Sequence, residues 1–277
     1  MGVSICMAAV WLFLGFLVFW IPGEASARLK IQKLDYSRAW KSYLSDKAFL
    51  EPVREYPFET CFRQAAKEYD LPMTLLLAIA RGESDFNPRS KSSKSCYGIM
   101  QIQWPGTARD LGFTSLSQLY EPCRNIKAGA KYIRMMLNRY HGDLHRALAA
   151  YNYGPGRISR KKGALIPQGA IWYSGYIYHH LQKVMAGAAN ARSVPLGRQK
   201  YFPGTKTPVI RFHNPFRARD FMAYFNERAP DLRLDWFRTS LGETYVVLIT
   251  DTKAEQETCF KHMKELGYSL NLNKAFQ

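Results

Sequence analysis

Acidic residues are scarce in this chain of 277 residues, which has 22 Asp and Glu against 39 Lys and Arg and a formal net charge of +17. This surplus favours anionic partners, meaning nucleic acid, acidic lipid or an acidic polymer, and does not choose among them. No recognised nucleic-acid motif is present, so we expect no nucleic-acid partner. Hydrophobic residues make up 47% of the chain, which is an ordinary globular composition and allows one large or two smaller domains.

Cysteine is also sparse, and the five cysteines do not have the spacing of a zinc site or any histidines clustered with them. We therefore predict no metal site and no cofactor. Cys6 lies in an apolar N-terminal segment, which leaves Cys61, Cys96, Cys123 and Cys259. If the chain is exported, these four can form disulfides, and their positions alone leave three pairings open.

Positive charge is missing before the apolar segment of residues 3–22. Ala25-Ser26-Ala27 follows it as an A-x-A cleavage site, so we expect residues 1–27 to be a signal peptide and the chain to be exported. Without Lys or Arg before the apolar run, a retained N-terminal anchor is the alternative, and only then would the membrane be a partner. No cysteine follows at the position that lipid attachment needs.

Strand patterns are absent between residues 57 and 186, where apolar residues recur at helical spacing. A basic lead-in with one short helix, residues 28–56, comes before them. We expect Asp70 and Asp143 to cap helices, with Pro72 in the first turn after Asp70. The expected helices cover residues 58–69, about 72–86, 105–111, 125–140, 144–152 and 168–186.

The second of these helices is an apolar run that ends in a lone carboxylate, Glu83, before Asn87-Pro88 stops the helix. A helix that is buried on most sides would have this pattern. Burial and the negative end of the helix dipole both disfavour the charged form, so the pKa of Glu83 should be raised. A glutamic acid that is protonated near neutral pH suits general acid catalysis. The alternative is an ordinary helix-end glutamate in solvent.

A Ser- and Lys-rich loop leads from this helix to Gly98-Ile99-Met100-Gln101. The small Gly98 allows close approach of a backbone or ligand. Gln101 is a candidate ligand residue, because a buried amide without a partner is costly. Met100 either contacts a ligand or packs in the core.

Four motifs together resemble the soluble lytic transglycosylase family, which has the SLT domain of glycoside hydrolase family 23 and is related to goose-type lysozyme. They are Glu83-Ser84, the stretch from Gly98 to Ile102, Asn125 to Gly129, and Ala150 to Gly156. The resemblance covers roughly residues 57–185. It implies an all-α, lysozyme-like catalytic domain over residues 57–186, with a long sugar-binding groove. It also implies a location in the periplasm or cell envelope of a bacterium.

The resemblance also implies a reaction and its residues. Such proteins act on peptidoglycan glycan strands and cleave the β-1,4 bond between N-acetylmuramic acid and N-acetylglucosamine without water. Glu83 would protonate the glycosidic oxygen and then take the proton of the muramyl C6 hydroxyl, which attacks C1 to give a 1,6-anhydromuramyl end. Tyr151 would position or polarise Glu83, and Asn152 would hold the loop or the sugar. The implied substrate-binding residues are Ser84, Met100, Gln101, Tyr151 and Asn152.

A second carboxylate is missing from the pattern, because Trp172-Tyr173-Ser174 stands where many relatives carry Glu-Thr-Arg. Glycosidases that use two carboxylates place them roughly 5 to 9.5 Å apart. Asp85, only two positions from Glu83, would point elsewhere on a helix. A hydrolytic muramidase and a catalytically weak wall-binding or assembly protein are the alternative functions. Trp172 and Tyr173 either stack on sugars or pack in the core.

Some secretion-associated relatives carry Cys-Phe and Pro-Cys pairs that match Cys61-Phe62 and Pro122-Cys123 here. The resemblance therefore implies a Cys61–Cys123 disulfide, and secretion or division machinery of the envelope becomes a possible partner.

The C-terminal part has a different pattern. Residues 187–206 are expected to be a linker. Residues 207–277 have a βαββαβ order, with a capping box at Thr252 and a last strand at residues 269–272. This order is similar to the SPOR domain, which binds glycan strands; the alternative is a ferredoxin-like accessory domain with an unknown ligand. The predicted fold class is thus α+β overall, and we expect the C-terminal domain to fold alone.

Overall fold

The computed structural model describes residues 35–45, 51–52, 54–161, 163–185, 204–213, 215–238 and 243–268. The predicted signal peptide, most of the predicted linker and the expected last strand at residues 269–272 lie outside these ranges. Within them, no helix combines the length and the apolar character that crossing a membrane requires.

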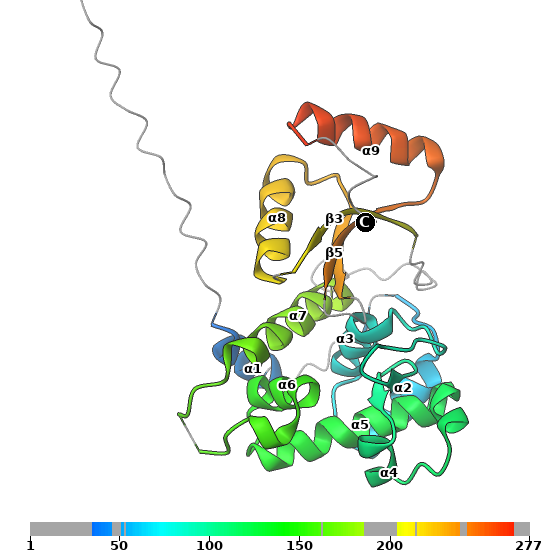
Figure 1. The fold of residues 1–277 in the computed structure, drawn as a ribbon, viewed down its shortest axis with the longest axis vertical. Helices are drawn as coiled ribbons and strands as arrows, with labels where there is room; N and C mark the ends of the chain where they lie inside the picture. Colours follow the sequence, from blue (N-terminus) through cyan, green and yellow to red (C-terminus); the bar gives the residue numbers. More distant parts are fainter. Residues whose placement is uncertain are drawn as a thin grey trace, which may run out of the picture. The chain divides into compact units, whose positions relative to one another are not determined.

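Helices dominate the described residues up to 185, as the apolar spacing predicts (Figure 1). α3 is the buried one, since every residue from Thr74 to Gly82 is buried, and it contacts α2, α5 and α7. Two short 3-10 turns, η1 (Leu116–Tyr120) and η2 (Pro155–Arg157), join the later helices. The helices are α1 (Tyr36–Ser45), α2 (Glu59–Glu68), α3 (Met73–Ser84), α4 (Gly106–Asp110), α5 (Pro122–Arg139), α6 (Leu144–Tyr153) and α7 (Gln168–Met185).

The expectation of a region without strands is wrong at one place. β1 (Cys96–Tyr97) and β2 (Ile102–Gln103) form an antiparallel pair on either side of residues 98–101. Two residues per strand are too few to produce a visible alternation, so the sequence pattern could not indicate them. The pair matters because it fixes both ends of the loop at residues 98–101, which carries most of the second motif.

Helix caps agree with expectation at one of two positions. The Asp143 carboxylate accepts a hydrogen bond from the backbone N–H of Arg146 at 3.0 Å, which caps α6 as predicted. Asp70 does not cap α3, because its backbone is left-handed, with φ of 49°, and the N-cap position belongs to Pro72. The turn before α3 is instead held by Arg134, whose guanidinium donates to the carbonyl of Tyr69 at 2.7 Å.

The lead-in and the disulfide tie outlying segments to this helical core. In α1, Trp40 is buried and its Nε1 donates to the Ser174 hydroxyl at 2.7 Å. α1 is therefore attached to the helical core through Trp40. The predicted Cys61–Cys123 disulfide is confirmed and links α2 to α5.

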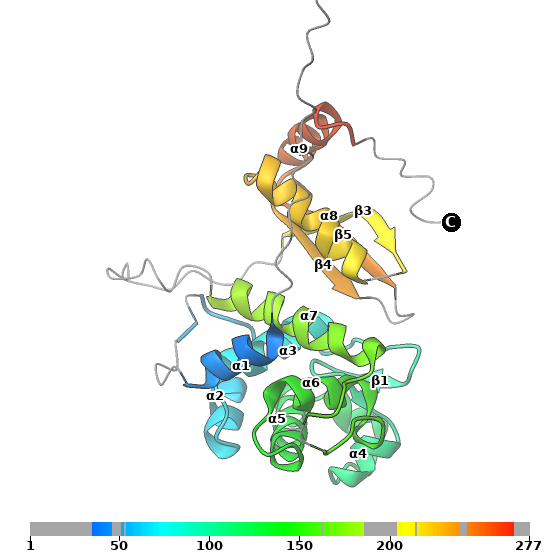
Figure 2. The same ribbon diagram turned by 90° about the vertical axis from the view of Figure 1, so that its left-hand side faces the viewer.

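The C-terminal elements form a three-stranded antiparallel sheet with β5 in the centre, in the order β3-β5-β4. α8 lies along the sheet (Figure 2), and α9 packs on β5. The Thr252 capping box is confirmed, because its hydroxyl accepts from the Glu255 N–H at 3.1 Å. The chain order βαββα agrees with the prediction over the described residues. Its elements are β3 (Thr205–Phe212), α8 (Pro215–Arg228), β4 (Leu234–Arg238), β5 (Thr244–Thr250) and α9 (Lys253–Glu265).

β4 differs from the expected half-buried strand. Leu234 and Trp236 are buried as the alternation predicts, but Asp235 between them is also buried, at 1% exposure. Asp235 contacts charged and imidazole groups of α3 and α7, so both faces of β4 are covered. The domain boundary at residues 187–206 stays a prediction, because side chains on its two sides are in direct contact.

Candidate active site

Glu83 lies in the last turn of α3, which ends at Ser84 and is followed by Asp85 in a left-handed conformation with φ of 49°. One Glu83 carboxylate oxygen accepts a hydrogen bond from the hydroxyl of Tyr173 in α7. The ring of Tyr173 is nearly parallel to that of Tyr151 in α6, with centroids 6.4 Å apart. The carboxylate therefore lies where α3, α6 and α7 meet, beside the aromatic rings of Tyr173 and Tyr151.

The pKa of Glu83 is raised to about 7, mainly because the surrounding protein removes water from its carboxylate. The Tyr173 hydrogen bond and the positive charge of Arg238 act in the opposite direction and stabilise the charged form. The direction predicted from the sequence is confirmed. At neutral pH both protonation states are populated, so this one group can give up a proton and take one back.

The backbone of residues 98–101 is attached to the Glu83 helix and to α6. The Ser84 hydroxyl donates to the carbonyl of Ile99 at 2.8 Å. The Tyr151 hydroxyl donates to the carbonyl of Met100, also at 2.8 Å. Residues from three of the sequence motifs thus form one hydrogen-bonded unit around the end of α3.

Asn125 supplies the fourth motif to the same unit. It is fully buried, and its side chain accepts from the Met100 N–H at 2.7 Å while donating to the carbonyls of Tyr97 and Leu119 at 2.9 Å each. Gly98 is required here, because its φ is +76° and a Cβ would lie 2.3 Å from the Asn125 amide. The loop is thereby fixed from its inner side.

The side chains of the predicted substrate-binding residues divide into two groups. Met100 is fully buried, and a Cβ on Gly129 would lie 2.6 Å from it, so the core-packing alternative holds and direct sugar contact does not. The Tyr151 hydroxyl donates its hydrogen bond to the Met100 carbonyl and not to Glu83. Gln101 and Asn152 are partly exposed; the Gln101 amide donates to the Gly98 carbonyl at 2.8 Å.

Tyr173 is a site residue that the sequence did not single out as one. Because it lies on the apolar stripe of α7, the sequence offered sugar stacking or core packing for it, and the residue is 1% exposed. Its ring does pack in the core, while its hydroxyl reaches Glu83. Periodicity predicts which face of a helix is buried and gives no information about the partner of a tyrosine hydroxyl.

Arg238, the last residue of β4, also reaches this site from the C-terminal sheet. Its Nη1 donates to the Asn152 side-chain oxygen at 3.4 Å, and its guanidinium carbon lies 4.5 Å from the centroid of the Trp172 ring. Its backbone N–H donates to the Tyr176 hydroxyl at 3.3 Å, which in turn donates to the carbonyl of Gly82 at 2.7 Å. Nothing local in the sequence indicates this proximity.

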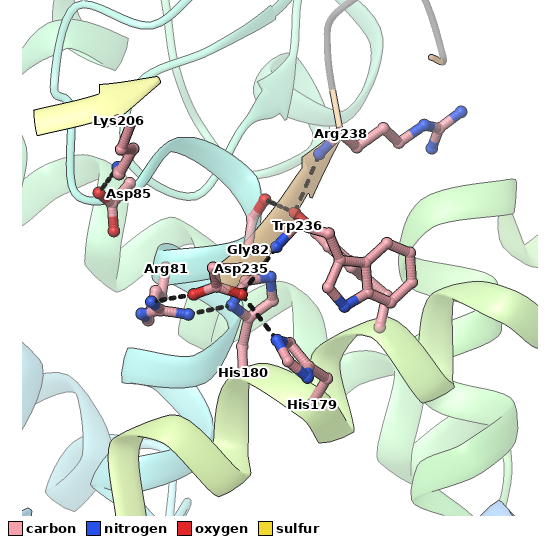
Figure 3. A network of polar contacts seen from close by, with 10 residues as sticks. Arg81, Gly82, Asp85, His179, His180, Lys206, Asp235, Trp236 and Arg238 are labelled. Atoms are coloured by element: carbon pink, nitrogen blue, oxygen red, sulfur yellow. Dashed lines mark hydrogen bonds and ion pairs between the residues drawn. The ribbon is translucent and has the colours of Figure 1, made fainter. Parts of the chain in front are cut away.

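A buried polar cluster joins the helical part of the chain to the C-terminal sheet, beginning two residues before Glu83 at Arg81 (Figure 3). Arg81 forms an ion pair with Asp235, and their side chains are 6% and 2% exposed. Burial alone would raise the pKa of Asp235, but the positive charge of Arg81 and the hydrogen bond from His179 hold it well below its usual range. His179 Nε2 donates to Asp235 at 2.7 Å, and Arg81 donates to His180 Nδ1 at 2.6 Å.

The imidazoles and carboxylate of this cluster lie within 4.8 Å of one another, close enough to hold a metal ion. Arg81 already donates to both Asp235 and His180, and its positive charge opposes a cation at that place. Burial lowers the pKa of His180, so that side chain is neutral. We therefore infer a structural role for the cluster, which holds α3, α7 and β4 together.

Comparison with known proteins finds similarity over the motif residues. Residues 60–165 match the transglycosylase SLT domain. The matched segment includes Glu83 and all five predicted substrate-binding residues, whereas Tyr173, Asp235 and Arg238 lie beyond its end.

The chain is also similar to named lytic murein transglycosylases. The chain is 32% identical over 121 residues to the membrane-bound lytic murein transglycosylase C of Yersinia enterocolitica, covering 39% of this chain and 34% of the relative. It is 34% identical over 108 residues to the soluble lytic murein transglycosylase of Escherichia coli, covering 36% and 17%. The crystal structure of the 70 kDa soluble lytic transglycosylase of E. coli is similar with a TM-score of 0.43 at 25% identity, covering 60% of this chain and 31% of that one. The chain thus spans about a third or less of these relatives.

Proposed function

We propose that this chain is a lytic transglycosylase that cleaves the β-1,4 bond between N-acetylmuramic acid and N-acetylglucosamine in peptidoglycan. The observation that carries the proposal is a single carboxylate, Glu83, whose pKa is raised to about 7 inside a segment that matches the SLT domain. A general acid and base works best when its pKa is near the working pH. Glu83 meets this condition for both directions of proton transfer.

The reaction uses Glu83 twice. Protonated Glu83 gives its proton to the glycosidic oxygen as the bond from C1 to that oxygen breaks. The resulting carboxylate accepts the proton of the muramyl C6 hydroxyl as its oxygen bonds to C1, which restores the acid and gives a 1,6-anhydromuramyl end. The Tyr173 hydroxyl donates to the carboxylate and stabilises it between the two transfers.

A water-using mechanism needs a second carboxylate to activate the water or to form a covalent intermediate. Among the described residues, the carboxylate nearest to Glu83 in sequence is that of Asp85, and it forms an ion pair with Lys206. The charges that shift the pKa of Glu83 come from Arg238, and no carboxylate of the described ranges contributes to that shift. This favours the transglycosylase reaction over a hydrolytic muramidase.

Export to a bacterial envelope is part of the same proposal, since the substrate lies there. It is supported by the A-x-A site after the apolar N-terminal segment and by the disulfide between Cys61 and Cys123. A link to secretion or division machinery, and glycan binding by the C-terminal sheet, remain predictions from the sequence.

Replacing the acid by its amide tests the assignment of Glu83. Glu83→Gln keeps an oxygen that can accept from Tyr173 but cannot cycle a proton, so release of soluble fragments from purified sacculi should fall by roughly 10⁴-fold, the upper end for a positioned acid and base. Circular dichroism and pelleting with sacculi should be unchanged. Glu257→Gln, an exposed glutamate of α9, is the matched control and should keep full activity. Turnover of Glu83→Gln within tenfold of the wild type would contradict the assignment.

A further inference from the structure

The guanidinium of Arg238 is presented beside the catalytic carboxylate by a strand from outside the SLT segment. β4 is an edge strand of the sheet, and Arg238 is its final residue. The Tyr176 hydroxyl holds the Arg238 backbone, and the side chain extends away from the buried Asp235 cluster (Figure 3). Its contacts are then with Trp172 of α7 and Asn152 of α6.

The charge of Arg238 is available to a ligand. Across the described ranges, no carboxylate forms an ion pair with it, in contrast to Arg81, which is paired with Asp235. Its side chain is partly exposed and donates one long hydrogen bond, of 3.4 Å, to Asn152. A guanidinium has five donors in a planar fork that matches a carboxylate, and stacking on an aromatic ring holds that plane in place.

The proposed substrate provides such a group. Muramic acid differs from glucosamine by a lactyl ether, whose carboxyl group is either free or the attachment point of a peptide that ends in carboxylates. Resting on the function proposed above, we propose that Arg238 binds a carboxylate of the muramyl substituent and so selects the muramyl unit for the position next to Glu83. Trp172 fixes the guanidinium plane, and Asn152 fixes its edge.

This assigns the C-terminal sheet a part in the active site. The buried Arg81–Asp235 ion pair and the contact from Tyr176 to both Gly82 and Arg238 fix β4 against the end of α3. The distance between Arg238 and Glu83 is therefore set by the same contacts that hold the catalytic helix. A free, tethered wall-binding module would have no need of them.

The test compares Arg238→Met and Arg238→Lys with wild type on sacculi before and after amidation of their carboxylates. On untreated sacculi, Arg238→Met should raise the half-saturating concentration roughly 10- to 100-fold, the range for one charge-assisted hydrogen bond, and Arg238→Lys should raise it less. On amidated sacculi, assayed at a pH below the alkaline limit of all three proteins, wild type and both variants should have the same half-saturating concentration. Arg217→Met, an exposed arginine of α8, is the matched control and should behave as wild type throughout.

Two further arms complete the experiment. Glycan strands stripped of peptide carry a free lactyl carboxylate, so an Arg238→Met defect on these strands shows that Arg238 also binds that carboxylate, and no defect on them confines the contact to carboxylates of the peptide. The Arg238 charge lowers the pKa of Glu83, so Arg238→Met should move the alkaline limit of activity to higher pH, which a purely structural residue would not do. An equal defect on untreated and amidated sacculi would overturn the proposal, as would no defect in an active, folded variant. Inactive wild type would instead overturn the proposed function.

Discussion

Removing the Tyr173 hydroxyl tests how the Glu83 carboxylate is controlled. In Tyr173→Phe the buried ring stays in place, while the hydrogen bond to Glu83 is lost. Hydrogen bonds to charged groups contribute about 1.5–3 kcal/mol. This bond stabilises the charged carboxylate that exists between the two proton transfers. Its loss therefore raises the free energy of that charged state. If that full amount appears in the barrier, kcat falls by about 10- to 100-fold.

The same change has a defined effect on pH dependence. The Tyr173 hydrogen bond lowers the pKa of Glu83, so Tyr173→Phe should raise that pKa further above its usual range. The general acid is active when protonated, and the alkaline limit of kcat should therefore move to higher pH. The assay is a pH–rate profile of fragment release from soluble glycan strands, with thermal unfolding to confirm the fold. Tyr140→Phe is the control, because its hydroxyl donates to the carbonyls of Pro155 and Ile158, not to Glu83. A folded Tyr173→Phe with wild-type kcat and an unshifted profile would refute this role.

The remaining predictions concern the buried ion pair. Asp235→Ala should destabilise the chain by about 3–5 kcal/mol, because it removes the carboxylate that forms a buried ion pair with Arg81. The melting temperature should drop by roughly 6 to 20 °C. A loss below about 2 °C would show that the pair contributes little. The double variant Arg81→Met with Asp235→Leu should recover most of that stability, because two apolar side chains replace the ion pair and no buried charge remains at that place. A double variant as unstable as Asp235→Ala would contradict this explanation.

The sequence predicted the features that depend on local pattern. The buried α3 follows from its apolar run, and the raised pKa of Glu83 follows from placing a carboxylate at the end of that run. The Cys61–Cys123 pair came from the resemblance, since spacing alone left three pairings.

What the sequence missed depends on contacts between distant segments. Asp235 looked like a solvent-facing residue of an alternating strand, because its partner Arg81 lies 154 residues away. Tyr173 looked like a core residue, and its ring is one. The pattern of a helix or strand reports which face is covered and not which group covers it. This is why Arg238 was counted with the general basic charge and not placed beside Glu83.

The ends of the glycan chains that the protein produces decide whether Glu83 works with the substrate's own C6 hydroxyl or with water. Purified sacculi are digested with the wild-type chain, and the released muropeptides are identified by mass spectrometry. A single acid and base without a partner carboxylate predicts mainly 1,6-anhydromuramyl ends, which are lighter than reducing ends by one water. Mainly reducing muramic acid ends would contradict the proposed mechanism and assign the protein to the hydrolases.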